Sequence, residues 1–157
     1  MNLSDPNYAK YALVQEMMET VNVVKNFNPD TTKAIAQKIK SIGKLLLTGE
    51  GSSRIFPAKN AIRKALTWGI DMAIFTDGSR QSAQYDLSKF AVFCASNSGR
   101  TKEIIVLAKK LEAIGNPNRF ALTANKDTLL EKACTQAFVL NAGWEKAVAA
   151  TKSVVEQ

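Results

Sequence analysis

Short apolar runs alternate with amphipathic segments along most of this chain, and the alternation limits the folds that it can adopt. The apolar runs span residues 44–48, 72–76, 90–95, 119–123 and 137–140. The segments with helical periodicity between them span residues 56–68, 81–85, 102–114 and 128–134. Short continuous apolar runs are typical of strands that are buried on both faces of a parallel sheet. Strands and helices in this order predict an α/β fold: a doubly wound parallel sheet of about five strands, flanked by helices.

Two further helices precede the first predicted strand. Apolar residues recur at helical spacing from Tyr8 to Phe27, and Asn28 follows the stripe. Asp30 or Thr31 can cap a second helix that ends at Gly43. We therefore expect residues 1–43 to pack as N-terminal helices on a domain that spans residues 44–157.

The end of the chain has no helix stop signal. A predicted final helix begins at Glu145 and is still helical in pattern at Gln157. Such an ending is compatible with a fragment, or one half, of a larger protein.

The chain contains no histidine, which excludes a Ser/His triad and a His-ligated metal centre within it. Cys94 and Cys134 are 40 residues apart, in neither a C-x-x-C nor a metal-ligand spacing. We predict no metal site and no cofactor, two buried and inert thiols, and a reducing compartment. The N-terminus lacks the apolar core of a signal peptide and no stretch is long enough to span a membrane, so we expect a cytoplasmic protein.

The formal net charge of +7 favours anionic partners. Phosphorylated metabolites, nucleic acid and a membrane surface all fit the charge alone. The chain has no zinc finger, no RNP aromatic motif and no basic run. We therefore predict that neither nucleic acid nor a membrane is a partner.

The loop Ser96-Asn97-Ser98-Gly99-Arg100-Thr101 is the strongest candidate for a site. It joins a predicted strand to a predicted helix, and in an open α/β sheet ligands bind at such loops. Its three hydroxyls and the free N–H groups of a helix start suit a phosphate dianion, and the loop has no carboxylate. A helix cap explains the same residues, because Thr101 can cap the helix without any ligand. Composition leaves these two interpretations about even.

A second glycine turn, Gly49-Glu50-Gly51-Ser52-Ser53, follows the first predicted strand. Arg54 stands where a dinucleotide fingerprint requires glycine, and neither loop contains the G-K-[ST] of a Walker A motif. The turn therefore predicts two serine hydroxyls beside the first loop rather than a nucleotide site.

Together with residues 123–125 and 143–152, these loops resemble the SIS family of sugar-isomerase domains over nearly the whole chain. The resemblance is to the two-domain branch that includes the isomerase half of glucosamine-fructose-6-phosphate aminotransferase and the fructosamine deglycases. It implies a flavodoxin-like, three-layer fold. Residues 96–101 look like the family's S-x-S-G-x-T phosphate loop, residues 49–53 like its G-x-G-[TS]-S turn, and residues 145–152 like its E-x-x-V-A-S-T-K segment.

The resemblance implies a substrate-binding role for residues of all three motifs. These are Gly51, Ser52, Ser53, Ser96, Asn97, Ser98, Thr101, Val148, Ala150 and Lys152. Ala150 replaces a frequent serine, which puts a sugar contact there in doubt. Lys152 can equally be a solvated helix residue. Glu145 is the candidate for a catalytic carboxylate, with a structural role at a helix start about as well supported. Trp68 and Trp144 are expected to be packing residues.

The resemblance implies a sugar phosphate of the hexose or hexosamine 6-phosphate class as the partner. The expected function is phosphosugar binding within an aldose–ketose isomerase, aminotransferase-isomerase or deglycase. A non-catalytic sensor that binds a sugar phosphate is the alternative. The family's principal glutamate base and ring-opening histidine would come from a second SIS domain or subunit, so we expect a homo-oligomer or a paired second SIS domain.

Overall fold

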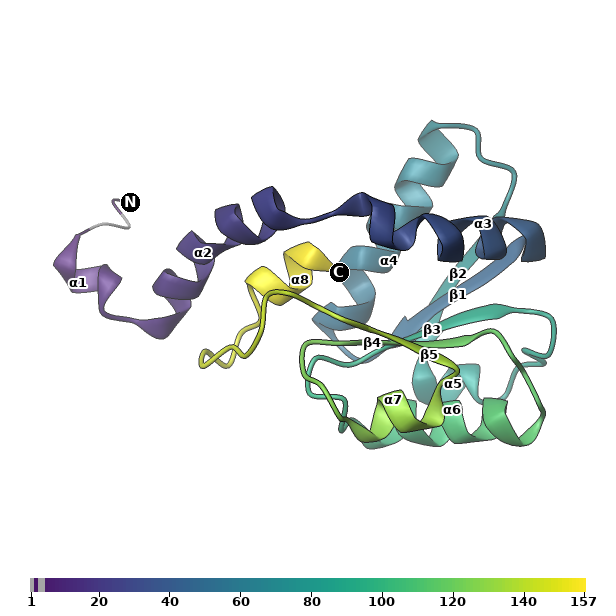
Figure 1. Ribbon diagram of the computed structural model, residues 1–157. Coiled ribbons are helices and arrows are strands. Elements are labelled where there is room, and N and C mark those ends of the chain that lie inside the picture. The colour runs from purple at the N-terminus through teal and green to yellow at the C-terminus, as the bar shows by residue number, and fades with distance from the viewer. Residues whose placement is uncertain (1, 3–4) are drawn as a thin grey trace.

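The computed structural model describes residue 2 and residues 5–157, and its centre is a five-stranded parallel sheet (Figure 1). The strands are β1 (Lys44–Gly49), β2 (Ala73–Gly78), β3 (Ala91–Ala95), β4 (Arg119–Thr123) and β5 (Gln136–Val139). Their order across the sheet is β2-β1-β3-β4-β5, and every neighbouring pair is parallel. The predicted doubly wound α/β fold is confirmed.

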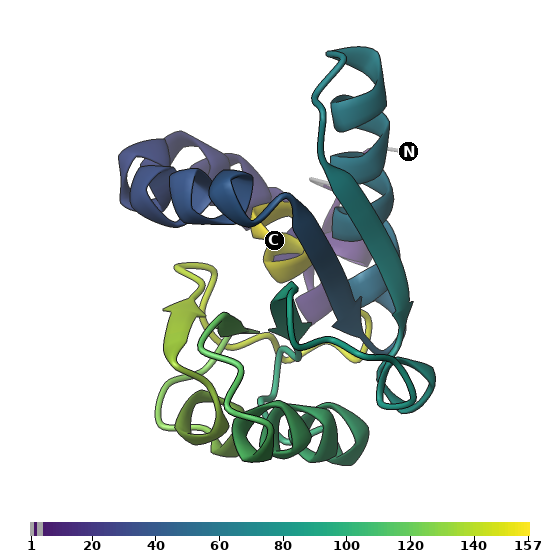
Figure 2. The same ribbon diagram turned by 90° about the vertical axis from the view of Figure 1, so that its right-hand side faces the viewer.

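Helices cover both faces of the sheet (Figures 1 and 2). The elements that precede the sheet are α1 (Pro6–Ala9), α2 (Ala12–Asn26), a 3-10 helix (Pro29–Thr32) and α3 (Lys33–Ile42). The later helices are α4 (Ser52–Thr67), α5 (Ser79–Ser82), α6 (Lys102–Ala113), α7 (Leu129–Ala133) and α8 (Lys152–Glu156). Helices α3 and α4 lie on one face, and α5, α6 and α7 lie on the other. Across the described residues, no helix combines the length and the apolar character that a membrane span requires.

Alternation along the strands builds a core on each face of the sheet. In β1, Leu45 packs with Ile35 and Ile39 of α3, whereas Leu46 packs with Leu107 and other residues of the α6 face. Successive side chains of a strand point to opposite faces, so an uninterrupted apolar run serves both cores.

Several helices differ from those predicted. Helix α5 spans Ser79–Ser82 rather than residues 81–85, and the predicted helix 8–27 is divided into α1 and α2. Helices α4 and α8 begin several residues away from their predicted starts. Helix α4 begins at Ser52 rather than near Phe56, because Gly51, at a φ of 58°, completes the turn out of β1 within two residues. Helix α8 begins at Lys152 rather than at Glu145. The chain from Glu145 to Thr151 is not helical, since the Glu145 carboxylate instead accepts hydrogen bonds from the start of α8.

Helices α2 and α3 have different neighbours. Helix α3 packs on the sheet, whereas α2 extends away from the sheet and contacts α8 (Figure 1). Glu16 of α2 is buried, and its carboxylate accepts hydrogen bonds from the backbone N–H groups of Lys146 and Ala147. Glu19, one turn further along α2, pairs with Lys152 of α8. The division of the chain at residue 43 remains a prediction.

Replacing Glu16 with alanine is expected to lower the free energy of unfolding by about 1–3 kcal/mol, because two backbone donors lose their acceptor. Asn22→Ala, at an exposed position of the same helix, is the matched control and should change stability by less than about 0.5 kcal/mol. Urea unfolding measures both values, and limited proteolysis should show faster cleavage within residues 145–151 of the Glu16 variant. Equal stabilities for the two variants would contradict the prediction.

Candidate functional site

The two predicted loops leave neighbouring strands at the same end of the sheet. Gly49 of β1 lies beside Ala95 of β3, and the chain then turns to opposite faces, into α4 after β1 and into α6 after β3. This point of divergence is the topological switch point, where open α/β sheets bind their ligands. Residues 50–53 and 96–101 therefore both lie at this end of the sheet.

The loop 96–101 carries two hydroxyls that face each other. Ser96 Oγ and Thr101 Oγ1 are 2.8 Å apart. Thr101 occupies the N-cap position of α6, but its side chain makes no capping hydrogen bond to the helix. The hydroxyl of Thr101 therefore points to its loop partner, and the first turn of α6 has no side-chain acceptor from its N-cap residue. This geometry favours the anion site over the helix cap that composition left open.

Gly99 permits a close contact between the loop 96–101 and Thr128, the residue before α7. Its φ is 61°, and a Cβ at this position would lie 2.3 Å from Cβ of Thr128. The backbone N–H of Leu130 donates to the carbonyl of Gly99 at 3.2 Å, which ties α7 to the loop. Both the backbone angle and the packing require glycine here.

The side chain of Asn97 forms hydrogen bonds with other residues of the protein. Its amide donates to Ser153 Oγ at 2.8 Å, and its side-chain oxygen accepts from Gln157. The backbone carbonyl of Asn97 accepts from the side chain of Asn125 at 3.0 Å. Asn97 therefore joins the loop to α8 and to the segment after β4. A direct contact of Asn97 with a ligand remains a prediction.

The turn after β1 also depends on glycine. A Cβ at Gly49 would lie 2.6 Å from the carbonyl oxygen of Ala95, so the two strand ends approach as closely as glycine allows. Ser52 and Ser53 lie in the first turn of α4, which has no side-chain cap. The Glu50 carboxylate accepts from the backbone N–H of Ser79 at 3.0 Å. That contact fixes Glu50 toward α5.

The segment 145–152 is held by carboxylates at both ends. The Glu145 carboxylate accepts from the backbone N–H and the hydroxyl of Thr151, at 2.7 and 2.9 Å, and from the Ser153 hydroxyl. Val148 is fully exposed and Ala150 is half-buried. Lys152 is 8% exposed and paired with Glu19. Lys152 is thus not a solvated helix residue, and its ammonium is held by α2.

The contacts of Glu145 fix its charge. Burial alone would raise the pKa of this carboxyl, but the hydrogen bonds from Ser153 and Thr151 outweigh burial and lower the pKa below its ordinary value of 4.5. Glu145 is therefore a carboxylate at neutral pH. These contacts favour a role in positioning residues 151–153, and a catalytic role for Glu145 remains a prediction.

Because the folded-state pKa of Glu145 is lowered, its contribution to stability is complete above pH 4.5 and is lost as the pH falls through the folded-state value. We expect the melting temperature of the unchanged protein to fall more steeply than that of Glu145→Gln as the pH decreases below 4.5. Melting curves of both proteins from about pH 7 to about pH 3 measure the difference. Parallel curves over that range would contradict the assignment.

Both tryptophans are exposed, so the prediction that they are packing residues is wrong. Trp68 is 67% exposed at the end of α4, and Trp144 is 71% exposed just before Glu145. The hydrophobic pattern around these two positions does not indicate whether the side chain is buried or exposed. Sequence reasoning also missed Thr128 as a support of the loop, because it lies 29 residues after Gly99 and no local pattern links the two.

The two cysteines differ in burial. Cys94 is buried as predicted, whereas the prediction that Cys134 is buried is wrong, since Cys134 is half-buried; both thiols are free. A hydrogen bond to Cys134 and burial together raise the pKa of Cys94, which disfavours its reactive thiolate. Within residue 2 and residues 5–157, no group of three or more His, Cys, Asp or Glu side chains is placed to hold a metal ion.

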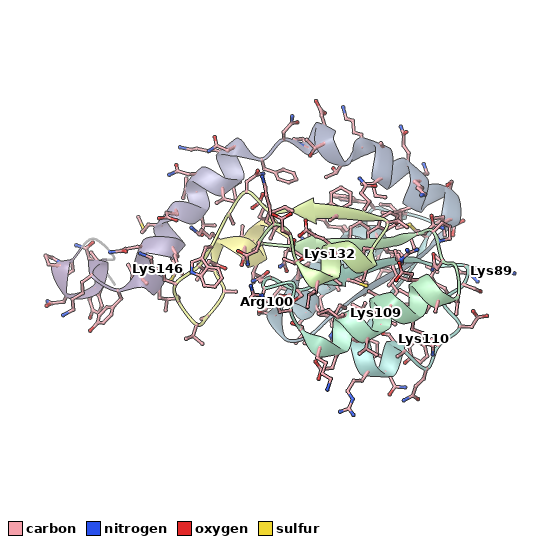
Figure 3. The ribbon with its side chains drawn as sticks, turned by 60° about the horizontal axis from the view of Figure 1, so that its bottom comes forward. Lys89, Arg100, Lys109, Lys110, Lys132 and Lys146 are labelled. Carbon is pink, nitrogen blue, oxygen red and sulfur yellow. The ribbon has the colours of Figure 1, made fainter. Side chains whose placement is uncertain are left out.

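Basic side chains surround the α6 and α7 side of the molecule (Figure 3). Arg100 lies at the start of α6, at the end of the sheet where the two loops meet, whereas Lys109 and Lys110 lie further along that helix. Lys132 belongs to α7. Of these side chains, the Arg100 cation lies at the loop end of the sheet, where it favours the approach of an anion.

Comparison with solved structures assigns the fold. A protein of Escherichia coli CFT073, solved in complex with a sugar phosphate, shares 21% sequence identity and superposes with a TM-score of 0.72 over 98% of this chain and 84% of its own. The C-terminal domain of glucosamine-fructose-6-phosphate aminotransferase from Francisella tularensis gives 16% identity and a TM-score of 0.70, over 92% of this chain and 43% of its own. The sugar isomerase domain of the RpiR transcription factor from Sphaerobacter thermophilus shares 12% sequence identity with this chain. It superposes with a TM-score of 0.66 over 92% of this chain and 80% of its own.

These structures confirm the resemblance at the level of the fold, and the chain has the fold of sugar-isomerase domains. No protein-family model matches the sequence, and no curated protein matches it.

Proposed function

We propose that the chain binds a sugar phosphate, of the hexose or hexosamine 6-phosphate class, with the phosphate held by residues 96–101. The observation that carries the proposal is the pair of hydroxyls of Ser96 and Thr101, 2.8 Å apart at the uncapped start of α6. Two hydroxyls, free N–H groups and the positive end of a helix dipole are the donors that a phosphate dianion requires. Ser98 and the glycine backbone complete the loop.

The sugar would lie toward β1. Gly51, Ser52 and Ser53 stand on the other side of the switch point, at the start of α4. Val148 and Ala150 belong to the segment that Glu16 and Glu145 hold in place, and the exposed side chain of Val148 is free to cover a ligand. Lys152 would support this segment through Glu19 rather than contact the sugar.

The proposed activity is part of an aldose–ketose isomerase, an aminotransferase-isomerase or a deglycase. Such reactions move a proton between adjacent carbons and need a positioned base and a group that opens the sugar ring. The chain contains no histidine, and Glu145 is engaged by Thr151 and Ser153. The remaining catalytic groups would come from a second copy or a second SIS domain in a cytoplasmic assembly. The E. coli structure with its sugar phosphate and the aminotransferase domain support this proposal.

A sensor without catalytic activity is the second candidate. The RpiR transcription factor carries the same fold in its sugar isomerase domain, which supports a role in which sugar-phosphate binding controls a partner. Ligand binding by the intact assembly without any turnover would favour this candidate.

Thermal stabilisation by fructose 6-phosphate, glucosamine 6-phosphate and fructosamine phosphates tests the binding. We expect at least one of them to raise the melting temperature, and the double variant Ser96→Ala, Thr101→Val to weaken that ligand by about tenfold or more, since each hydroxyl would donate to a charged group. Ser41→Ala, an exposed serine of α3, is the control. If no sugar phosphate stabilises the protein or is turned over, the proposed function is wrong.

A further inference from the structure

A pocket opens between the loop 96–101 and the start of α7. Its volume is about 500 Å³, within the range of sites that hold small organic ligands. Ser98 and Arg100 line one side, Lys126, Asp127 and Leu129 line another, and Trp144 contributes from the segment before Glu145. The pocket adjoins the proposed phosphate site, but neither β1 nor the turn that follows it contributes to the lining.

The wall on the α7 side is rigidly attached to the loop. The hydrogen bond from Leu130 to Gly99 and the contact between Thr128 and Gly99 fix the start of α7. Thr128 and Glu131 form a reciprocal capping box there. Asp127 adopts a φ of 58°, the only positive φ of a residue other than glycine in the described part of the chain. These contacts fix the wall of the pocket that α7 provides.

The apolar part of the pocket is a pair of exposed side chains. Trp144 is 71% exposed and Leu129 is 57% exposed, and both line the pocket. An exposed indole is a large apolar surface, and a flat ring that stacks against it removes that surface from water. These two side chains suit a planar aromatic group.

The charged part of the pocket suits a dianion. Arg100 and Lys126 line the pocket and, among the described residues, form no ion pair. An arginine fork and an ammonium group together match the charge of a phosphate monoester. The Asp127 carboxylate can accept a hydrogen bond from a hydroxyl or an amino group of the same ligand.

We propose that this pocket binds a nucleoside monophosphate, with the base on Trp144 and Leu129, the phosphate on Arg100 and Lys126, and a ribose hydroxyl or base amino group on Asp127. This ligand combines a planar ring, a dianionic phosphate and hydrogen-bond donors, which are the three groups that the pocket matches. The pocket shares Ser98 and Arg100 with the loop 96–101, but Ser96, Thr101 and residues 50–53 do not line it. Nucleotide binding here therefore does not require the hydroxyl pair that carries the proposed function.

Tryptophan fluorescence tests the proposal with the full chain. The Trp68→Phe variant leaves Trp144 as the one tryptophan, because the sequence contains two. This variant is titrated with AMP, GMP, CMP and UMP, with the corresponding nucleosides, and with inorganic phosphate, under excitation at wavelengths that the nucleotides do not absorb. We expect saturable quenching by at least one monophosphate, at a concentration at least about tenfold below that needed for its nucleoside or for phosphate. Quenching by none of them, or equal quenching by a nucleoside or by phosphate alone, overturns the proposal.

Calorimetric titration of variants assigns the residues. Arg100→Ala and Trp144→Ala should each weaken the monophosphate by about tenfold or more, whereas Trp144→Phe, which keeps an aromatic ring, should recover most of the affinity. The double variant Ser96→Ala, Thr101→Val should bind the monophosphate as before. If that double variant loses the nucleotide, the phosphate lies on the hydroxyls of Ser96 and Thr101, and the second site is refuted. If sugar phosphates fail to bind but the monophosphate still binds, the proposed function is refuted and the nucleotide site stands.

Discussion

Gly99→Ala is expected to abolish stabilisation by any sugar phosphate and to lower the free energy of unfolding by about 2–4 kcal/mol. Two costs combine at this position. The positive φ of 61° disfavours any residue with a Cβ, and the added carbon would lie 2.3 Å from Thr128, which the capping box of α7 holds in place. The loop must move away from α7, and the hydroxyls of Ser96 and Thr101 then no longer face each other at 2.8 Å.

Gly115→Ala separates the two costs. Gly115 has a φ of 71°, but a Cβ there would meet no atom within 4 Å. This control should lose only about 1 kcal/mol from the backbone conformation and should retain ligand-induced stabilisation. Urea unfolding and thermal shift with ligand measure both variants. If Gly99→Ala behaves like Gly115→Ala, the packing of α7 against the loop does not shape the site.

Asn116→Ala is expected to have the largest effect on stability outside the site, a loss of about 3 kcal/mol or more. The Asn116 amide is 2% exposed and donates to the carbonyls of Leu87 and Phe90, at 2.8 and 3.1 Å, while its oxygen accepts from the N–H of Asn118 at 2.7 Å. The variant removes all three hydrogen bonds. The Leu87 carbonyl keeps the Phe90 N–H as a donor, but the Phe90 carbonyl and the Asn118 N–H lose the Asn116 side chain, and each unsatisfied buried group costs about 1–3 kcal/mol.

The position of the Asn116 hydrogen bonds also predicts that ligand affinity should not change. Residues 87–90 precede β3 and residues 116–118 precede β4, so the network lies at the amino end of the strands, opposite the proposed ligand site. Ligand affinity of the folded Asn116 variant, measured by calorimetry at low temperature, should equal that of the unchanged protein. Asn118→Ala removes a side chain beside the network and is the stability control. A loss below about 1 kcal/mol for Asn116→Ala would contradict the role of this amide.

Periodicity predicted the order and type of the elements well because local patterns determine them. Residues 119–123 form β4 within the predicted limits, and α6 ends one residue before the predicted end. The start of α8 was predicted seven residues too early, because apolar residues recur at helical spacing from Glu145 onward. In the structure, the Glu145 carboxylate instead accepts hydrogen bonds from Ser153, eight residues later, and the chain between them is not helical up to Thr151. Hydrogen bonds between a side chain and the backbone leave no period in a sequence.

The candidate loops were found from the sequence because hydroxyls and glycine at a strand-to-helix turn have a recognisable composition. Their support could not be found in that way. The contact of Thr128 with Gly99 and the burial of Lys152 against Glu19 join residues that are 29 and 133 positions apart. Such contacts depend on tertiary packing, and a single sequence contains no signal for them.

The hydrogen bonds from residues 146 and 147 to Glu16 join positions that are 130 and 131 residues apart. A contact between such distant positions closes most of the chain into one loop, and contacts of this separation form late in folding. During synthesis, α2 leaves the ribosome long before its partner does. We therefore expect the sheet to assemble first, with hydrogen-exchange protection at Lys146 and Ala147 appearing only in the last folding phase, so that competence to bind a ligand is acquired after the rest of the domain is native.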